Sequence, residues 1–302
     1  MNQVLKLGMS GLLVEVVQVR LNITRTGVFD KKLYDAVKLF QEENGIKPDG
    51  IIGQMTWNKL DLSPTEIFAD TDVSTSATWI EQYNLPAGEF VDKETPKKWI
   101  VLHGNHGTYN PYKQIDTWAK DHRGRVGSHY VIGGSGKSLG QDGDVDGRIL
   151  QAIKDVNWGY HLGAIENLDI QPESISIELC NAGPLNKAGD KFHTWYGLEI
   201  LEEEVLVLDR PFNGNKYFHK YSEKQIKSLK ALLLFLRDKH GIDIKEGIVT
   251  SLLNNPKPEA SFDYMPMSMK SKTGLYTHAN LNKLKSDLFP QPELIKMLNS
   301  LK

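Results

Sequence analysis

The sequence predicts an α/β protein with a mixed central β-sheet flanked by helices, preceded by a small all-α domain of three helices. After about residue 76, short β-branched and apolar runs alternate with helical patterns, which favours a sheet covered by helices. Within residues 1–62 the apolar residues recur at helical spacing. Residues 63–75 are small, polar and acidic, so we expect a linker there, or else an ordered strap packed on one domain.

Three helices are expected in the N-terminal domain. Ser10 is a candidate N-cap for the first helix. The second begins after Asp30 and ends at Gly45, and the turn at 48–50 leads to the third. The apolar positions of the three patterns are Leu13, Val16, Val17 and Leu21; Leu33, Ala36, Val37 and Phe40; and Trp57 and Leu60.

The C-terminal domain, expected over 76–302, shows four strand-like runs and two clear helices. One helix follows Pro111. A longer one begins at Ser222, where Gln225 completes a capping box, and ends at Gly241. The expected strands are 99–102, 130–132, 148–150 and 174–179. The apolar face of the long helix is Ile226, Leu229, Leu232, Leu233 and Leu236.

Composition excludes several function classes. The chain has 36 basic and 38 acidic residues, which argues against a nucleic-acid partner because such a partner requires a basic face. The single cysteine, Cys180, excludes an intrachain disulfide and a zinc site built from several thiolates. The N-terminal segment lacks the features of a signal peptide, and no apolar run approaches the roughly 20 residues of a membrane span. We therefore expect no membrane insertion.

The residues that carry chemistry lie far apart in the sequence. His103 follows the apolar run 99–102, and His278, Lys285 and Asp287 fall within ten residues of one another. Two imidazoles and a carboxylate suit a catalytic zinc with a fourth position open for water, and a lysine can stabilise negative charge on an attacked carbonyl. In an extended stretch, the spacing of Lys285 and Asp287 places both side chains on one face. A Lys-x-Asp triplet is also common in solvated surface turns, so spacing alone leaves both interpretations open.

The order of motifs resolves the N-terminal domain further. The run LKLGMSGLLVEVVQVRLN, followed by TGVFDKKLYDAVKLFQEENGIKPDGIIGQMTWNKL, resembles the peptidoglycan-binding domain of the three-helix type. The resemblance implies a module without chemistry of its own that tethers an attached enzyme to bacterial peptidoglycan.

The C-terminal domain carries a second ordered set of motifs. In sequence they are WIVLHGNHGT, VGSHYVIGG, DGRILQAIKDVNWGYHLG, ENLDIQPESISIELCN, YSEKQIKSLKALLLFLRDKHGI and YTHANLNKLKSD. Together they resemble the zinc-dependent N-acetylmuramoyl-L-alanine amidases, which share their fold with phage amidase lysozymes and animal peptidoglycan recognition proteins. The likeness covers nearly all of the chain after the linker.

This resemblance implies a role for each residue. The Zn²⁺ ligands would be His103, His278 and Asp287. Glu178 would act as general base on the zinc-bound water and pass its proton to the leaving amine. Lys285 would stabilise the oxyanion formed when the amide between N-acetylmuramic acid and L-alanine is attacked.

The spacing before the last motif departs from the family. Many relatives place the second histidine at the end of a short strand soon after the long helix, but 247–253 contains no histidine. We interpret residues around 243–273 as an insertion, because His278, Lys285 and Asp287 occur together after it. A competing alignment places the site at 256–263, with Asp263 at the ligand position and the histidine lost. That version would be a metal-free protein that only binds.

Other positions near the motifs receive weaker assignments. Ser128 stands where some phage members have a tyrosine, so that role is absent or filled from elsewhere. His161 is expected to line the substrate groove, and His129 to be structural. His106 is an alternative ligand through its H-x-x-H spacing with the first histidine, and Cys180 is expected to be small buried apolar filling.

The sequence therefore predicts a two-domain peptidoglycan hydrolase that acts as a zinc amidase. A peptidoglycan-recognition protein without catalysis and a zinc endopeptidase that cuts a stem-peptide bond are the alternatives. Without a signal peptide, the expected setting is a phage lysin or a component of a phage or injection particle that acts on the cell wall. A cytoplasmic recycling enzyme fits less well, because a wall-binding module serves polymer.

Overall fold

The computed structural model describes residues 4–9, 12–21, 23–24, 26–60, 79–122, 124–139, 145–163, 170–266 and 270–301. The chain divides into two compact units, Met1–Ser74 and Thr75–Lys302. The expected linker at 63–75 and the expected cap Ser10 lie outside the described residues. Among the described helices, none combines the length and the apolar character that crossing a membrane requires.

The described residues of the N-terminal unit form three helices: α1 (Leu12–Arg20), α2 (Lys31–Glu43) and α3 (Gln54–Leu60). Asp30 caps α2 by accepting a hydrogen bond from the backbone N–H of Leu33, and Gly45 beyond its end has φ of 68°. These are the bounds that the capping and glycine signals predicted. The core joins one face of each helix to the flanking loops: Leu5, Val14, Val17, Phe29, Leu33, Val37, Ile52, Trp57 and Leu60.

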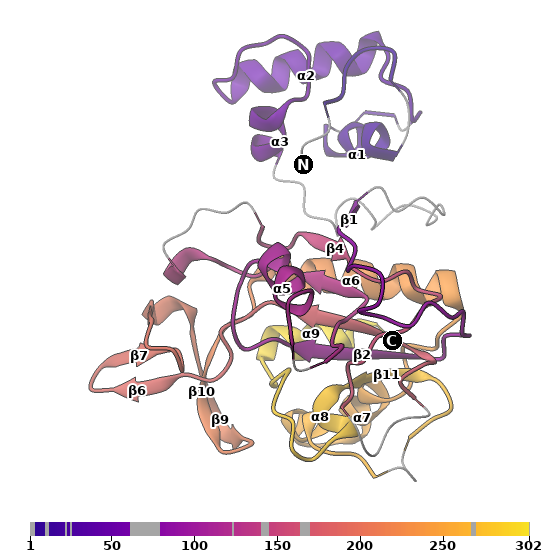
Figure 1. The fold of residues 1–302 in the computed structure, drawn as a ribbon. Helices are drawn as coiled ribbons and strands as arrows, with labels where there is room; N and C mark the ends of the chain where they lie inside the picture. Colours follow the sequence, from indigo (N-terminus) through magenta and orange to yellow (C-terminus); the bar gives the residue numbers. More distant parts are fainter. Residues whose placement is uncertain are drawn as a thin grey trace. The chain divides into compact units, whose positions relative to one another are not determined.

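A mixed six-stranded sheet forms the centre of the C-terminal unit (Figure 1). Its strands, in spatial order, are β1 (Ile80–Gln82), β4 (Ile149–Gln151), β3 (Tyr130–Ile132), β5 (Ser174–Leu179), β2 (Trp99–Gly104) and β11 (Gly274–Thr277). Only the β3–β4 pair is antiparallel. The parallel strands β5, β2 and β11 therefore end at one edge of the sheet, where sites of α/β proteins collect.

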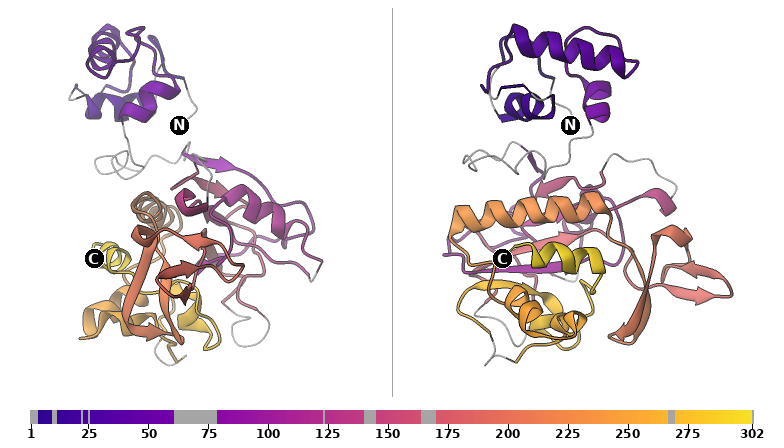
Figure 2. Two further views of the ribbon diagram at one scale, coloured as in Figure 1. Left: turned by 90° about the vertical axis from the view of Figure 1, so that its left-hand side faces the viewer. Right: turned by 180° about the vertical axis from the view of Figure 1, so that it is seen from behind.

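Helices cover both faces of this sheet (Figure 2). The long helix α6 (Glu223–His240) and α9 (Pro292–Asn299) lie together on one face. Helix α5 (Pro111–Trp118) lies on the other face, where its Ile115 and Trp118 pack on Val131 and Leu150. Two short helices, α7 (Ile248–Asn254) and α8 (His278–Leu281), pack near β11.

The α6 N-terminus differs from its prediction. Ser222 accepts a hydrogen bond from the backbone N–H of Gln225, which forms half of the expected capping box. The Gln225 side chain does not return to the cap. It donates to the backbone carbonyls of Ile132 and Cys180, and so ties the helix to the ends of β3 and β5. A buried amide satisfies two strand carbonyls here, which outweighs a local cap.

Residues 186–219 add two small sheets that the sequence analysis did not predict. Strands β6 (Asn186–Ala188), β7 (Lys191–His193) and β8 (Glu199–Ile200) form one, and β9 (Val205–Phe212) and β10 (Asn215–His219) form a hairpin. Both project beside the central sheet (Figure 1). The Asn213–Gly214 turn of the hairpin has positive φ at both residues, which is the Asn-Gly turn signal that predicts such a hairpin.

Candidate metal centre

The strand register brings two distant histidines together. Strand β2 is two residues longer than predicted, so His103 lies within it. Strand β11 pairs in parallel with β2, with Thr277 opposite Leu102. His278 follows Thr277 directly and begins α8, so it lies beside His103 at the same sheet edge. The Thr277 side chain caps α8 through a capping box with Asn280, which fixes this change from strand to helix.

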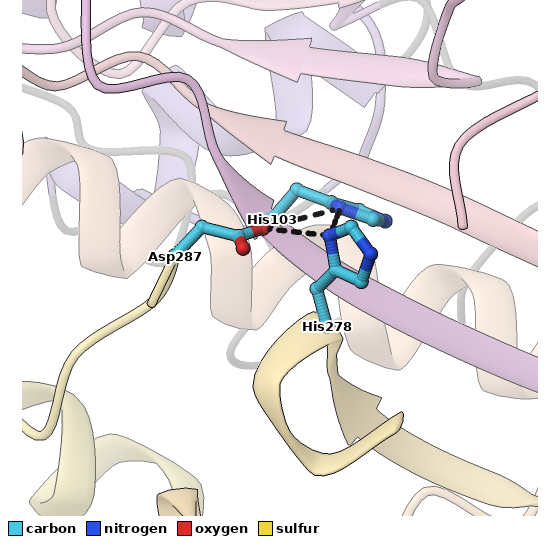
Figure 3. A group of neighbouring side chains, drawn as sticks. All are labelled: His103, His278 and Asp287. Atoms are coloured by element: carbon cyan, nitrogen blue, oxygen red, sulfur yellow. Dashed lines mark hydrogen bonds and ion pairs between the residues drawn. The ribbon is translucent and has the colours of Figure 1, made fainter. Parts of the chain in front are cut away.

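His103, His278 and Asp287 point toward one another from three segments (Figure 3). Nδ1 of His103 lies 3.0 Å from Nδ1 of His278 and 3.3 Å from Oδ2 of Asp287, and the His278–Asp287 distance is 3.1 Å. All three residues are buried. Ligands about 2.0–2.1 Å from a tetrahedral zinc lie roughly 3.3 Å apart, so these donor atoms have the spacing of a three-residue metal site.

A chain of hydrogen bonds leaves Nδ1 of His103 free to bind a cation. The Ser174 hydroxyl donates to the carbonyl of Gln171, so its oxygen accepts from Nε2 of His161 at 2.8 Å. Nδ1 of His161 then accepts from Nε2 of His103 at 3.0 Å. The network thus assigns the His103 proton to Nε2 and a lone pair to Nδ1, which faces the cluster.

The electrostatics of the cluster favour a cation. Burial and the neighbouring His278 lower the pKa of His103 to about 4, so the ring is neutral at pH 7, which is the form that binds metal. Burial alone would raise the pKa of Asp287, but the adjacent rings of His103 and His278 outweigh it and hold that pKa well below its usual range. Among the described residues, Nε2 of His278 is buried without a hydrogen-bond partner.

Glu178 lies on the neighbouring strand on the same face of the sheet. It is the register partner of His103 in the parallel β5–β2 pair, and paired residues of parallel strands project to one side. Ser128 donates a hydrogen bond to its carboxylate at 3.2 Å. Burial and the charge of Asp287 raise the pKa of Glu178 to about 8, although Ser128 and Lys285 oppose the shift. A carboxyl poised near neutral pH can both accept and return a proton.

Lys285 and Asp287 do not share one environment as an extended stretch would. A turn at 283–284 precedes them, and Lys285 is exposed whereas Asp287 is buried. The backbone carbonyl of Lys285 accepts a hydrogen bond from Asn213 at the tip of the β9–β10 hairpin. The charge of Lys285 is felt in the centre, since it lowers the pKa values of His103 and Glu178.

His161 makes its polar contacts behind the cluster. Both of its ring nitrogens contact protein groups. Burial and the neighbouring His103 hold the pKa of His161 well below its usual range. Its role in binding substrate stays a prediction. His129 accepts from the N–H of Ser176 and donates Nε2 to the carbonyl of Asn157, so it braces the strands.

The other weakly assigned residues lie outside the cluster. His106 is half-buried with φ of 51° and does not join the metal-site group found among the described residues. Cys180 packs in the apolar cluster with Val131 and Leu150. Asp263, the ligand of the competing alignment, pairs with Arg210 at the surface.

Sequence reasoning missed the groups that support the centre. Ser128 was noted only as a replacement for a tyrosine, and Ser174 and Gln171 were not identified at all. Each contacts its partner from a different segment, so no local spacing marks them. The exposed Trp195 and Tyr196 were also missed, although a Thr-Trp-Tyr-Gly turn between alternating residues is a visible signal.

A buried His–His–carboxylate cluster at the carboxyl edge of a mixed sheet defines a candidate metallohydrolase. Two family matches identify which kind. Residues 13–60 match the family described as a putative peptidoglycan binding domain, and residues 93–258, more than half of the chain, match the N-acetylmuramoyl-L-alanine amidase family. The chain belongs to this amidase family, as its motifs predicted. His103, His161 and Glu178 lie inside the matched region, and the last motif follows it.

Individual relatives are more distant or shorter. An uncharacterised protein of Kitasatospora aureofaciens is 48% identical over 40 residues, which are 13% of this chain and 34% of that protein. The chain thus spans about a third of the curated relative it matches. A crystal structure of a peptidoglycan-binding protein from Clostridioides difficile, in complex with glutamine hydroxamate, is 38% identical over 20% of this chain and 40% of that chain, with a TM-score of 0.19. The structure of PlyL is 12% identical to this chain, and the match covers 74% of this chain and 96% of PlyL, with a TM-score of 0.40.

Proposed function

We propose that this protein is a zinc-dependent amidase that cleaves the amide bond between N-acetylmuramic acid and L-alanine of bacterial peptidoglycan. The observation that carries the proposal is the convergence of His103, His278 and Asp287 in a chain of the amidase family. Two neutral imidazoles and one carboxylate are a donor set of catalytic zinc sites, which keep one position open.

The residues would divide the work as follows. When bound, zinc lowers the pKa of water and polarises a carbonyl oxygen. Glu178, on the face that carries His103, takes a proton from the attacking water and returns it to the leaving amine. Lys285 places a positive charge beside the centre and stabilises the negative charge that develops on the amide oxygen. His161 keeps His103 oriented with its lone pair forward.

Product analysis tests the proposed bond. A purified disaccharide-peptide should be split into an intact disaccharide and a free stem peptide with N-terminal L-alanine, detected by mass spectrometry. A shortened peptide still attached to sugar would identify an endopeptidase instead. No cleavage, together with retained binding to peptidoglycan, would identify a recognition protein.

Metal analysis tests the proposed ligands. The purified chain should carry one zinc per molecule by elemental analysis, and chelation should abolish cleavage until zinc is restored. His278→Ala should lose both zinc and activity, whereas the exposed His122→Ala serves as a matched control with both retained. Unchanged zinc content in His278→Ala would refute the ligand assignment.

We also infer that the chain works on polymeric cell wall. The peptidoglycan-binding match at 13–60 supports tethering to the wall. The full chain should sediment with purified sacculi, and a chain that stays in the supernatant would contradict tethering. Release as a phage lysin or carriage on a particle stays a prediction, and examination of the neighbouring genes tests it.

A further inference from the structure

We propose that Trp195 and Tyr196, here called the aromatic tip, bind a sugar of the glycan strand beside the metal centre. The aromatic tip connects β7 to β8 in the small three-stranded sheet. This inference rests on the proposed function, because it names how the same site would hold the polymer. The binding partner is an N-acetylhexosamine next to the sugar that carries the scissile amide.

The aromatic tip exposes two large rings. Trp195 is 70% exposed and Tyr196 is 44% exposed. Their ring centroids lie 5.2 Å apart at an interplanar angle of 85°, so the pair forms a corner rather than a closed stack. Exposed aromatic rings held together at a surface are a sign of a binding site.

The aromatic tip is fixed to the loop that leaves the metal centre. Nε1 of Trp195 donates to the backbone carbonyl of His106 at 2.8 Å, and the Tyr196 hydroxyl donates to the carbonyl of Gly107 at 3.0 Å. His106 is three residues after His103, at most about 11 Å along an extended chain. Nε1 of Trp195 and the hydroxyl of Tyr196 are therefore both hydrogen-bonded to the protein. A ligand near the centre would contact the surfaces of the two rings.

The sheet behind the aromatic tip packs on an apolar cluster of its own. Leu185, Phe192, Ile200 and Val205 form its own buried apolar cluster. Within the turn, the Thr194 hydroxyl accepts a hydrogen bond from the backbone N–H of Leu198. A preorganised ring pair loses little conformational freedom on binding, which reduces the entropic cost of holding a ligand.

The β9–β10 hairpin, which follows the small three-stranded sheet, contacts the loop that precedes Asp287. Asn213, at the tip of the β9–β10 hairpin, donates to the carbonyl of Lys285 at 2.7 Å. Both small sheets therefore contact loops that carry the centre, one after His103 and one before Asp287. This placement points to a role in holding substrate rather than in folding the central sheet.

The size and chemistry of the aromatic tip favour a sugar over a protein. Two aromatic rings bury roughly 150–250 Å² each, whereas a stable protein partner covers about 800 Å² per side. A pyranose ring presents C–H groups on its face and hydroxyls at its edge, and the C–H face is attracted to the negative face of an aromatic ring. Because the scissile amide is attached to a sugar, the glycan strand has to pass beside the metal centre.

Binding of short glycan fragments stripped of their stem peptides tests the proposal. Such fragments contain no scissile amide, so affinity is measured without cleavage, by calorimetric titration of the full chain. Trp195→Ala should weaken the affinity of the catalytic-domain site by about tenfold, the scale of one well-placed aromatic contact. Trp195→Phe should retain most of it, and Leu253→Ala, another exposed apolar side chain, should not change it. Binding by the N-terminal unit is common to all variants and cancels.

Kinetics supplies the second measurement. Trp195→Ala should raise KM for glycan strands that carry peptides, with kcat and the melting temperature unchanged. Equal glycan affinity in wild type and Trp195→Ala would overturn the proposal, as would a loss of affinity for free stem peptide instead of glycan. If the wild type lacks amidase activity but Trp195→Ala still loses glycan affinity, the proposed function fails and the sugar site stands.

Discussion

Each unit of the molecule buries a polar centre, and the two centres are built in opposite ways. In the N-terminal unit, Gln41 is 1% exposed and engages both of its polar atoms with the turn at 49–51 and with Thr56. Its oxygen accepts from the N–H of Gly50, and its nitrogen donates to the carbonyl of Ile51. Every bond closes within the unit, so the centre holds a turn in place.

The centre in the C-terminal unit leaves its functional atoms facing one another. His103, His278 and Asp287 share a small space, and Glu178 beside them has a pKa raised to about 8 by burial and by Asp287. Such an arrangement lowers the stability of the protein. It is therefore typical of sites where the groups bind a ligand or take part in a reaction. The contrast teaches that bonds to backbone mark a structural polar centre, while ionisable groups aimed at one another mark a functional one.

Replacing Glu178 should produce the largest effect and sharpen this contrast. Glu178→Gln keeps the shape but removes the group that moves protons, so kcat should fall by about 10²–10⁴-fold. Zinc content should stay at the wild-type level by elemental analysis. Ser128→Ala, which removes only the hydrogen bond to Glu178, should have a much smaller effect on kcat.

Stability provides the control for this variant. A carboxyl whose pKa is about 8 in the folded state and ordinary in the unfolded state keeps its proton to a higher pH when the protein is folded. Its contribution to stability is therefore full below the unfolded pKa and is lost as pH rises from there through about 8. In chelator-treated protein at pH 8, Glu178→Gln should melt at a higher temperature than wild type, and the gap should close towards pH 5. A lower melting temperature at both pH values would make Glu178 a structural residue.

Removing Lys285 tests whether an exposed side chain belongs to the functional centre. Lys285→Ala should lower kcat by about 10²–10³-fold, the range for loss of one group that stabilises an oxyanion. Zinc content and stability should not change, because the side chain is exposed and its main-chain bond to Asn213 remains. Lys283→Ala, two residues earlier and also exposed, is the matched control. Loss of zinc in Lys285→Ala would assign it a different role.

Replacing His161 tests whether a histidine with both ring nitrogens bonded to protein groups supports the metal centre or lines the substrate groove. His161→Ala removes the acceptor for the His103 proton and should weaken zinc affinity by about 10–100-fold in competition with a chelator. His161→Asn places an amide oxygen near the position of Nδ1 and should restore most of that affinity. Unchanged zinc affinity with a raised KM would instead support the expected place in the substrate groove.

Much of this centre could be predicted because its residues lie at the ends of recognisable elements. The run 99–102 predicted the strand that carries His103, and the order of motifs paired it with His278 and Asp287 across the whole domain. The insertion before His278 stays a prediction; along the chain, α7 and the segment after it lie between α6 and β11. Strand β11 pairs with β2, and this places His278 beside His103.

The supporting groups could not be predicted, because they depend on side-chain contacts between segments. Ser128 meets Glu178 across 50 residues, and His161 meets His103 across 58. Gln225 had a local explanation as a capping residue, and the tertiary contacts with β3 and β5 overrode it. Local patterns predict where an element begins, but they do not state which buried group a polar side chain will meet.

Replacing Gln41 should have the smallest effect on catalysis. Stability and wall binding should fall while cleavage is unchanged. Gln41→Leu leaves the buried N–H of Gly50 without its acceptor, at about 1–3 kcal/mol for a buried group left unpaired, whereas the carbonyl of Ile51 keeps the N–H of Gly53. The N-terminal unit should unfold at lower denaturant concentration and lose affinity for sacculi, while cleavage of a soluble disaccharide-peptide stays unchanged. Gln54→Leu, at an exposed glutamine whose side chain donates to Asn58, should change stability by less than about 0.5 kcal/mol. A Gln41→Leu protein of unchanged stability that still loses sacculus binding would show that this buried amide acts in ligand binding, and the distinction between the two centres would fail.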